Sequence, residues 1–215
     1  MSSIANQLQS VLDNFKQHAP EAVKEPITRS RAEIVASFDK SKVLSPGSKL
    51  PDFKLNDASG KPVTRDELLA KGALLLTFYR GNWCPFCNIA LHGLQQHLAE
   101  FAAKGVTLVA VSPELPDNSL TTKEKNDLEF EVLSDEGNKF ARELGIVWRM
   151  PEYLKPAFGE LGTDLAKRHG NHEFEVPVPA NFLVDKEGVV RNVFVDSDYT
   201  KRLEPATAVE WANAL

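Results

Sequence analysis

The chain contains two cysteines, Cys84 and Cys87, within the stretch WCPFC. They follow an apolar run and precede a segment with helical periodicity. Two cysteines separated by two residues can alternate between a dithiol and a disulfide, or they can bind a metal ion. A helix that begins near Pro85 places Cys84 at the cap or in the first turn. The same helix places Cys87 one turn deeper, on the stripe that faces the core.

This asymmetry predicts different roles for the two sulfur atoms. The thiolate is the reactive form of cysteine, and the free N–H groups and dipole of a helix N-terminus stabilise it. We therefore expect Cys84 to be exposed, to have a lowered pKa, and to attack a peroxide oxygen or a substrate sulfur. Cys87 is expected to be sheltered and to close a disulfide with the resulting adduct.

Three other interpretations of the cysteine pair remain open. A structural zinc site needs about four ligands, but the sequence has no second cysteine pair, and His92 and His97 are predicted on other faces of the helix. A structural disulfide is typical of oxidising compartments. Two core cysteines without a chemical role are also conceivable. Dithiol redox chemistry is favoured because the pair lies at the start of a helix.

The elements around the cysteines predict an α/β fold. The run Ala73–Tyr79 is almost wholly apolar, as in a strand buried on both faces. A helix over about Pro85–Ala103 and a strand over Val106–Ser112 follow, which indicates two parallel strands with a right-handed crossover. Short strands are expected around Phe53 and Val63. The segments ANFLVD and VVRNVFVD predict an antiparallel hairpin, and a last helix runs from Pro205 to Leu215.

The N-terminal part of the chain reads as a helical extension. Apolar residues recur at helical spacing over the first forty residues, and Pro20 and Pro26 are each expected in a first helical turn. The turn-rich stretch SPGSKLPDF marks the join to the main domain. The predicted division is therefore a helical extension over residues 1–44 and a redox domain over residues 45–215.

Composition restricts the classes of function. The 215 residues carry a net charge of -5, which argues against a nucleic-acid or anionic membrane partner. The first twenty residues lack the pattern of a secretory signal, and no apolar run reaches the length of a membrane span. We expect a cytoplasmic location.

The sequence resembles a known family at three stretches. WCPFC, the upstream LPDFKLNDASGKPV and the downstream VPVPANFLVDKEGVVRNVFVDSDYTKRLEP are similar to peroxiredoxin-like proteins of the AhpC/TSA group, in the thioredoxin superfamily. The resemblance covers about residues 45–215. It implies a thioredoxin-like fold, Cys84 as the attacking cysteine, Cys87 as the resolving one, and Pro179 as a cis-proline that faces the site. It also implies that an external thiol donor, rather than a prosthetic cofactor, supplies the electrons.

The chain departs from both parent patterns. Ordinary peroxiredoxins carry a proline and a threonine seven and three residues before the attacking cysteine, where this chain has Thr77 and Gly81. Their arginine before the late strand is replaced by Pro179. Thioredoxins keep a buried carboxylate where this chain has Phe78. The groups that usually orient a peroxide are therefore missing.

Several neighbours of the cysteines are candidate supporting residues. Trp83 is expected to shield the thiolate or to be an ordinary core residue. Arg80 could stabilise the Cys84 thiolate, although a solvated arginine at the end of the strand is the favoured interpretation. Pro85 gives a turn similar to that of glutaredoxins, which implies a potential of about -200 to -230 mV.

Two more distant segments carry weaker signals. An insertion over about residues 147–175 contains the stretch LAKRHGNHEFEV, which is expected to be irregular, with His169 and His172 on the surface. The stretch DSDYTKRLEP is expected to cap and dock the last helix.

The favoured function is an antioxidant oxidoreductase that reduces hydroperoxides through the Cys84–Cys87 dithiol. A reductant of the thioredoxin, glutaredoxin or glutathione type would recycle it. The first alternative is a disulfide reductase or thiol–disulfide carrier. The second is a redox sensor or binding module, suggested by the N-terminal helices, which could equally form a homodimer arm or cover a sheet edge.

Overall fold

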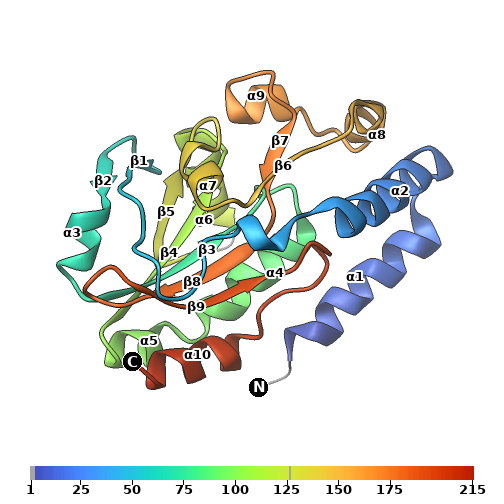
Figure 1. Cartoon of the computed structure of the whole chain (residues 1–215). Helices are drawn as coiled ribbons and strands as arrows, with labels where there is room; N and C mark the ends of the chain where they lie inside the picture. Colours follow the sequence, from blue (N-terminus) through green and yellow to red (C-terminus); the bar gives the residue numbers. More distant parts are fainter. Residues whose placement is uncertain (1–2, 126) are drawn as a thin grey trace.

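A seven-stranded mixed sheet forms the centre of the molecule (Figure 1). The computed structural model describes residues 3–125 and 127–215. The strand order is β2-β1-β5-β4-β3-β8-β9; β3, β4 and β5 are parallel, and the other neighbours are antiparallel. The strands are β1 (Lys54–Asp57), β2 (Pro62–Thr64), β3 (Ala73–Phe78), β4 (Val106–Ser112), β5 (Glu131–Ser134), β8 (Ala180–Val184) and β9 (Val190–Val195).

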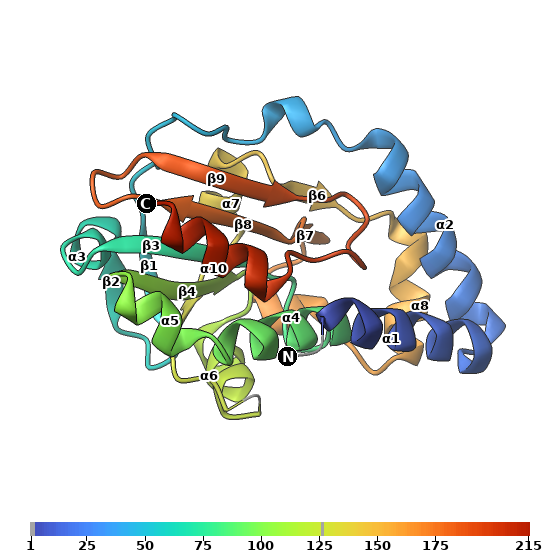
Figure 2. The ribbon, with the colours of Figure 1, turned by 90° about the horizontal axis from the view of Figure 1, so that it is seen from below.

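The sheet is buried on both faces, which explains the continuous apolar run of β3. All six residues of β3 are buried. Successive side chains of a strand point to opposite faces, so Leu75 belongs to one core cluster while Leu74 and Leu76 belong to the other. The first face is covered by α4 (Pro85–Gln95), α5 (Leu98–Ala103) and α10 (Pro205–Asn213), as Figure 2 shows. The second core includes residues of α3 (Arg65–Leu69) and α7 (Lys139–Glu143), while α6 (Pro116–Lys125) packs beside β5.

The predicted strand–helix–strand unit and the late hairpin are confirmed. Thr64 caps α3 in a capping box with Glu67. The single helix predicted over Pro85–Ala103 is wrong, because the chain breaks at Gln96 and His97 into α4 and α5. His97 is the N-cap of α5, and its Nδ1 lies 2.6 Å from Glu100 Oε1. The last helix ends at Asn213 rather than at Leu215.

The predicted N-terminal helices are confirmed as α1 (Ile4–His18) and α2 (Glu21–Ser37), followed by the short η1 (Lys40–Lys42). Pro20 is the N-cap of α2. Pro26 lies inside α2, so its predicted place in a first turn is wrong. The helix already begins at Glu21, and Pro26 therefore lacks an N–H that an interior helical bond would use.

Helix α1 packs closely along α4. A side chain at Gly93 of α4 would place its Cβ 2.9 Å from Ile4 Cγ2, so a glycine is needed for this approach. Glu204 fixes the start of α1 because its carboxylate accepts hydrogen bonds from Ser3 Oγ (2.7 Å) and from the backbone N–H groups of Ile4 (3.2 Å) and Ala5 (3.1 Å). Glu204 is also at the N-cap position of α10, but its side chain makes no capping hydrogen bond to that helix. The side chain of this residue from DSDYTKRLEP therefore caps α1 rather than the last helix, where the capping was expected.

The insertion over residues 147–175 is an ordered layer. The prediction that LAKRHGNHEFEV is irregular is wrong, because this stretch contains the helix Leu165–His169 and the start of the strand Glu175–Pro177. Strands β6 (Val147–Arg149) and β7 (Glu175–Pro177) pair antiparallel and enclose η2 (Glu152–Leu154), α8 (Lys155–Glu160) and α9 (Leu165–His169). These elements share a small apolar core that includes Leu154, Phe158 and Phe174. His172 is exposed, as expected. His169, the last residue of α9, is only 2% exposed, so its predicted place on the surface is wrong.

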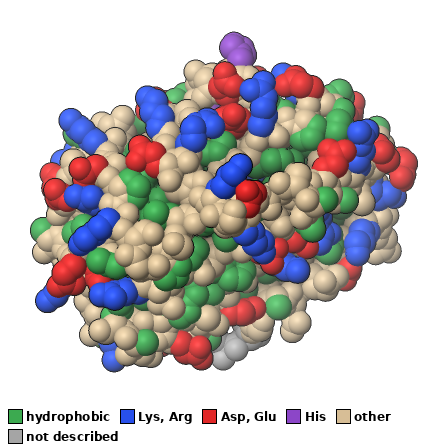
Figure 3. Space-filling model, in the orientation of Figure 1, with side chains coloured by type: hydrophobic (Ala, Val, Ile, Leu, Met, Phe, Trp, Pro, Cys, Tyr) green, Lys and Arg blue, Asp and Glu red, His purple; other side chains and the backbone are tan. Residues whose placement is uncertain are grey.

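The surface carries charges of both signs. On the face shown in Figure 3, lysine and arginine side chains are interspersed with aspartate and glutamate. This face offers no extended basic surface for a nucleic acid. Within the described residues, no helix has the length and apolar character required to cross a bilayer.

Candidate active site

Cys84 and Cys87 lie at the start of α4, just beyond the end of β3. Cys84 is the N-cap and Pro85 occupies the first helical turn, as predicted. The Cys84 carbonyl accepts the first helical bonds, from the N–H groups of Cys87 (3.0 Å) and Asn88 (3.2 Å). Both cysteines are free thiols in this structure.

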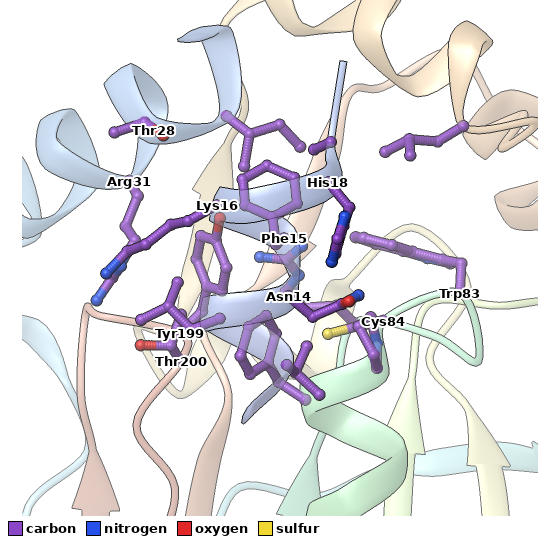
Figure 4. A pocket seen from close by; sticks show the side chains of 18 of the residues that line it. Asn14, Phe15, Lys16, His18, Thr28, Arg31, Trp83, Cys84, Tyr199 and Thr200 are labelled. Atoms are coloured by element: carbon purple, nitrogen blue, oxygen red, sulfur yellow. The ribbon is translucent and has the colours of Figure 1, made fainter. Parts of the chain in front are cut away.

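The predicted exposure of Cys84 is wrong. Each cysteine is only 1% exposed, because α1, the insertion and the loop after β9 cover the turn. Cys84 nevertheless lines a cavity of about 780 Å³ (Figure 4). Cys87 instead adjoins a much smaller space that Thr77, Pro179 and Arg202 also line. The predicted asymmetry therefore exists in another form: Cys84 borders the large cavity, which is partly open to solvent, and Cys87 lies behind Cys84.

The predicted acidity of Cys84 is also wrong. Burial, together with the hydrogen bond to Cys87, raises the pKa of the Cys84 thiol well above its usual range. Cys84 is the N-cap, but its side chain makes no capping hydrogen bond to the described first turn. Burial acts on Cys87 too, but the hydrogen bond from Cys84 and the charges of Arg202 and Arg80 lower the pKa of Cys87 to about 5. The reduced pair therefore holds one proton on Cys84 and the anion on Cys87.

Arg80 is buried beside the two thiols, so the favoured interpretation of a solvated arginine is wrong. Only 6% of the surface of Arg80 is exposed. The guanidinium lies 4.1 Å from the ring centre of Tyr199 and 4.6 Å from that of Trp83, within the range of cation–π attraction. A buried cation is costly unless an anion compensates it. The cysteine thiolate supplies a compensating charge for Arg80.

Arg202 is a site residue that the sequence analysis missed. Its Nη2 lies 3.5 Å from Cys87 Sγ, and its Nη1 donates to the carbonyl groups of Tyr199 and Lys201. These bonds hold the guanidinium against the deeper sulfur. The only signal in the sequence was the segment DSDYTKRLEP, which contains both Tyr199 and Arg202.

The prediction of a cis peptide bond before Pro179 is wrong, because every peptide bond in the described residues is trans. The backbone N–H of Val178 donates to the carbonyl of Ile146 at 2.6 Å and is not free to pair with a substrate. Pro179 still lies close to the site, since it lines the small space next to Cys87.

Trp83 packs beside the active-site turn, as predicted. Its ring meets Phe158 of the insertion edge to face, with 5.2 Å between the ring centres, and it lines the large cavity. The turn around it requires Gly81, whose φ is 137°. A Cβ at this position would lie 2.5 Å from Trp83 Nε1 and 2.8 Å from Glu114 Cδ. This crowding explains why the threonine of ordinary peroxiredoxins has no place here.

A buried ion pair attaches the insertion to the active-site turn. Glu114 is fully buried, and its carboxylate accepts from the backbone N–H of Asn82 at 2.9 Å. Arg168 of α9 donates to Glu114 Oε1 (2.9 Å) and to Asn82 Oδ1 (2.7 Å). The position of the turn before the cysteines therefore depends on α9.

The cysteines have no metal-binding neighbourhood in the described part of the chain, where no group of three or more His, Cys, Asp or Glu side chains could hold a metal ion. The arrangement that is present can donate two electrons and close a disulfide. One thiol borders a cavity, and a second sulfur lies one helical turn away. Arg80 and Arg202 stabilise a negative charge on this pair of sulfur atoms.

The sheet order and the dithiol at the start of α4 define a redox protein of the thioredoxin-like fold, which confirms the predicted fold class. The chain belongs to the AhpC/TSA family, whose family model matches residues 46–193. The resemblance stated from the sequence is therefore confirmed. Helices α1 and α2 lie outside the matched range.

Curated relatives include a chloroplastic peroxiredoxin Q of Oryza sativa subsp. japonica, 26% identical over 184 residues, with 84% of this chain and 74% of the relative covered. Peroxiredoxin Bcp of Escherichia coli strain K12 is 26% identical over 153 residues, 71% of this chain and 86% of the relative. The thiol-disulfide oxidoreductase ResA of Bacillus cereus is 24% identical over 154 residues, 71% of each.

Solved structures with the same fold include the peroxidoxin BcpB of Mycobacterium tuberculosis, with a TM-score of 0.62 and 20% identity over 80% of this chain and 98% of that one. The reduced Prx3 of Vibrio vulnificus, in complex with H2O2, also has a TM-score of 0.62 and 20% identity, over 79% of this chain and 99% of that one. At this identity the likeness concerns the fold.

Proposed function

We propose that this thiol-based oxidoreductase is a peroxidase that reduces hydroperoxides through the Cys84–Cys87 dithiol. The observation that carries the proposal is the arrangement of the two sulfur atoms: Cys84 borders the large cavity, and Cys87 lies one helical turn behind it. Membership of the AhpC/TSA family and relatives named peroxiredoxin support a peroxide as the substrate.

In the first step, Cys87 acts as the base for Cys84. The Cys84 proton moves to the Cys87 thiolate, and the Cys84 sulfur attacks the terminal oxygen of the hydroperoxide. The O–O bond breaks, Cys84 becomes a sulfenic acid, and the leaving alkoxide takes the proton from Cys87 to give the alcohol. Arg80, beside both sulfur atoms, stabilises the charge during this transfer.

In the second step, the restored Cys87 thiolate attacks the Cys84 sulfur. The S–O bond breaks, hydroxide leaves and takes a proton from solvent as water, and the disulfide forms. Two electrons and two protons from an external thiol donor return the pair to its reduced state. A donor of the thioredoxin, glutaredoxin or glutathione type would supply them, and no prosthetic cofactor takes part.

The remaining features of the proposal concern the whole chain. We keep the division into a helical extension over residues 1–44 and a redox domain over residues 45–215, a cytoplasmic location and a possible homodimer as parts of the proposal. Partners other than the hydroperoxide and the thiol donor are not required by the mechanism.

Thiol–disulfide exchange is the second candidate function. Two observations favour it: the peroxide-orienting residues of ordinary peroxiredoxins are absent from positions 77 and 81, and the similar ResA is named a thiol-disulfide oxidoreductase. A redox sensor or binding module is less well supported, because similar proteins are named peroxiredoxin or thiol-disulfide oxidoreductase.

Stopped-flow kinetics test the proposal directly. Reduced protein is mixed with hydrogen peroxide, with an organic hydroperoxide or with a protein disulfide, and the fluorescence change on oxidation is followed. We expect hydroperoxides to oxidise the protein far faster than they oxidise free cysteine. If hydroperoxides react no faster than with free cysteine while disulfides react quickly, the protein is a thiol–disulfide oxidoreductase and the proposal fails.

A further inference from the structure

Arg80 is a buried cation without a carboxylate partner in the described part of the chain. The groups whose charges act on it are Cys84, Tyr199 and Cys87. Its Nε is buried and has no hydrogen-bond partner among the described residues. An arginine side chain can adopt many rotamers, so the position of this guanidinium depends on the groups that pack against it.

Two aromatic rings pack against the guanidinium of Arg80. Its Cζ lies over both rings, 4.1 Å from the ring centre of Tyr199 and 4.6 Å from that of Trp83. Trp83 belongs to the active-site turn, whereas Tyr199 lies in the loop between β9 and α10. In the view of Figure 4 the two rings lie on either side of the Cys84 sulfur. Tyr199 therefore makes the shorter contact, and it does so from outside the turn that carries the cysteines.

Hydrogen bonds and packing fix the position of Tyr199. The carboxylate of the preceding residue, Asp198, accepts from the backbone N–H (3.2 Å) and the hydroxyl (2.7 Å) of Thr200. The same carboxylate accepts two hydrogen bonds from Arg31 of α2, at 2.7 and 2.6 Å. The Tyr199 ring meets Phe86 edge to face, with 6.2 Å between the ring centres, and only 7% of the surface of Tyr199 is exposed. A ring held in this way can hold the cation that lies against it.

Tyr199 also contacts the second arginine of the site. Its backbone carbonyl accepts from Arg202 Nη1, and Arg202 Nη2 lies 3.5 Å from Cys87 Sγ. Burial opposes a charge on Cys87, but the hydrogen bond from Cys84 and the charges of Arg202 and Arg80 lower the pKa of Cys87 to about 5. Both arginines that favour the thiolate therefore contact the same residue.

The sulfur atoms are the anions that face these two arginines. The large cavity adds Lys16 and His18 of α1 and Arg31 of α2, and none of the described residues that line it is an aspartate or a glutamate. Burial raises the pKa of the Tyr199 hydroxyl, so this residue stays neutral. The position of the Arg80 charge relative to the sulfur atoms therefore decides how strongly a thiolate is favoured.

We propose that Tyr199 is a positioning residue of the dithiol: its ring fixes Arg80 beside the sulfur atoms, and the fixed charge keeps one of them as a thiolate. Tyr199 touches no reacting atom and acts through Arg80. The inference rests on the proposed function, because the thiolate is the base that starts the reaction with a hydroperoxide. The thiolate is also measurable without any peroxide, so a wrong role for Tyr199 and a wrong substrate give different results.

Thiolate absorbance of the reduced protein tests the role of the ring. Tyr199→Phe keeps the ring and should leave the pKa of Cys87 at about 5. Tyr199→Met fills the space with a flexible apolar chain but offers no ring face, so the pKa of Cys87 should rise. The matched control is Tyr153→Met, which removes a tyrosine ring whose centre lies 4.3 Å from Arg29 Cζ and should leave the titration of Cys87 unchanged.

A fluorinated ring separates the contact with the cation from the packing. Phenylalanine and pentafluorophenylalanine are each incorporated at position 199. The two side chains have nearly the same shape, but fluorine reverses the charge of the ring face, which then no longer attracts a guanidinium. The fluorinated ring should raise the pKa of Cys87, while urea unfolding checks that the fold is kept. If the pKa stays at the value found with phenylalanine, the ring does not position Arg80 and the inference is overturned.

The rate of oxidation gives the size of the effect. Tyr199→Met should slow the reaction with hydrogen peroxide at pH 6 by about fivefold to thirtyfold, the equivalent of about 1–2 kcal/mol for a cation–π contact away from water. The loss should be smaller at pH 9, where the thiolate forms with less help from Arg80. A loss of the same size at both pH values, or an equal loss in Tyr199→Phe, would overturn the inference and leave the peroxidase function intact. A wild type that titrates as expected but reacts with hydrogen peroxide no faster than free cysteine does would instead refute the proposed function alone.

Discussion

The two cysteines share a single proton, and this arrangement predicts an unusual titration. Because the pKa of Cys87 is lowered to about 5 and that of Cys84 is raised, one thiolate should persist from neutral pH down to about pH 5, while the second thiol stays protonated. Thiolate absorbance at 240 nm measures this. The Cys87→Ser variant should lose the low-pH thiolate. Two thiols that ionise together near their ordinary pKa would refute the arrangement.

The same anion links stability to pH in the reduced protein. The pKa of Cys87 is about 5 in the folded state against an ordinary value of 9.0, so its contribution to stability is fully present above pH 9 and disappears as the pH falls to about 5. The reduced form should therefore gain stability relative to the disulfide form as the pH rises from 5 to 9. Urea unfolding of both forms across this range measures the difference. A difference that is flat with pH would contradict the lowered pKa.

Arg202 should control the acidity of Cys87. The guanidinium contacts Sγ at 3.5 Å, and its charge favours the thiolate. Arg202→Met should raise the pKa of Cys87 above 5 and slow the oxidation of the reduced protein at pH 6 by about tenfold, the effect of roughly 1.4 kcal/mol. Lys201→Met is the matched control, because Lys201 is exposed and pairs with Asp196 rather than with sulfur. Equal effects of the two substitutions would show that only the net charge matters.

At the scale of the elements, the sequence predicts what local periodicity encodes. Strand β3, strand β4 and the hairpin of β8 and β9 follow from apolar patterns that span five or more residues. Strands β6 and β7 have three residues each, and α9 has five, so each contains fewer than two periods of its pattern and shows no recognisable repeat. Their stability comes from the shared core around Phe158, which no local pattern indicates.

The sequence predicts the position of the two cysteines in the candidate site, but not the segments that bury them. The position of Cys84 as N-cap depends on residues next to it, and that prediction is correct. Its burial depends on α1 and on Phe158, which are more than sixty residues away in the sequence. The lowered pKa belongs to Cys87 rather than to Cys84 for the same reason, since Arg202 approaches Cys87 from a loop that is distant in the sequence. Long-range contacts of this kind leave no signal in a single sequence.

Because Arg168 attaches α9 to the active-site turn, Arg168→Met should strongly lower the free energy of unfolding. Removing one partner of a buried ion pair costs about 3–5 kcal/mol. We expect the lower end, about 3 kcal/mol, because the Arg168 side chain is 27% exposed while that of Glu114 is fully buried. Urea unfolding of the reduced protein measures the loss. The double variant Arg168→Met, Glu114→Gln should recover part of it, because it removes the buried charge.

Arg149→Met provides the control for this prediction. Arg149 belongs to the same insertion, but its contact with Glu173 is exposed and 3.6 Å long, so its replacement should change stability by less than about 0.5 kcal/mol. A similar loss in both variants would show that the insertion, rather than the Glu114–Arg168 pair, sets the stability.

At the scale of the whole molecule, three distant parts of the chain enclose Cys84. The family core supplies the cysteines, and the insertion supplies Phe158. Helices α1 and α2 form the outer wall of the cavity that Cys84 lines. Polar contacts hold the wall in place: Arg31 pairs with Asp198, Tyr153 donates to Glu33 at 2.7 Å, and Glu204 caps α1. Access to Cys84 should therefore depend on how firmly α1 and α2 are attached.

The Arg31–Asp198 pair predicts how this attachment responds to acid. Burial opposes ionisation of Asp198, but hydrogen bonds from Arg31 and Thr200 lower its pKa to about 2 from an ordinary value of 3.8. A carboxylate with a lowered pKa stabilises the folded state above its ordinary value, and this contribution is lost as the pH falls to about 2. The wall should thus loosen between about pH 4 and pH 2, and Arg31→Met should loosen it at neutral pH.

The reaction of Cys84 with 4,4′-dithiodipyridine, which proceeds in acid, measures the accessibility of Cys84, and hydrogen exchange locates the change in α1 and α2. Lys24→Met removes a pair within α2 itself and should leave both measurements unchanged. If Cys84 reacts as slowly in Arg31→Met as in the wild type, the Arg31–Asp198 pair does not hold the wall, and the other contacts of α1 and α2 do.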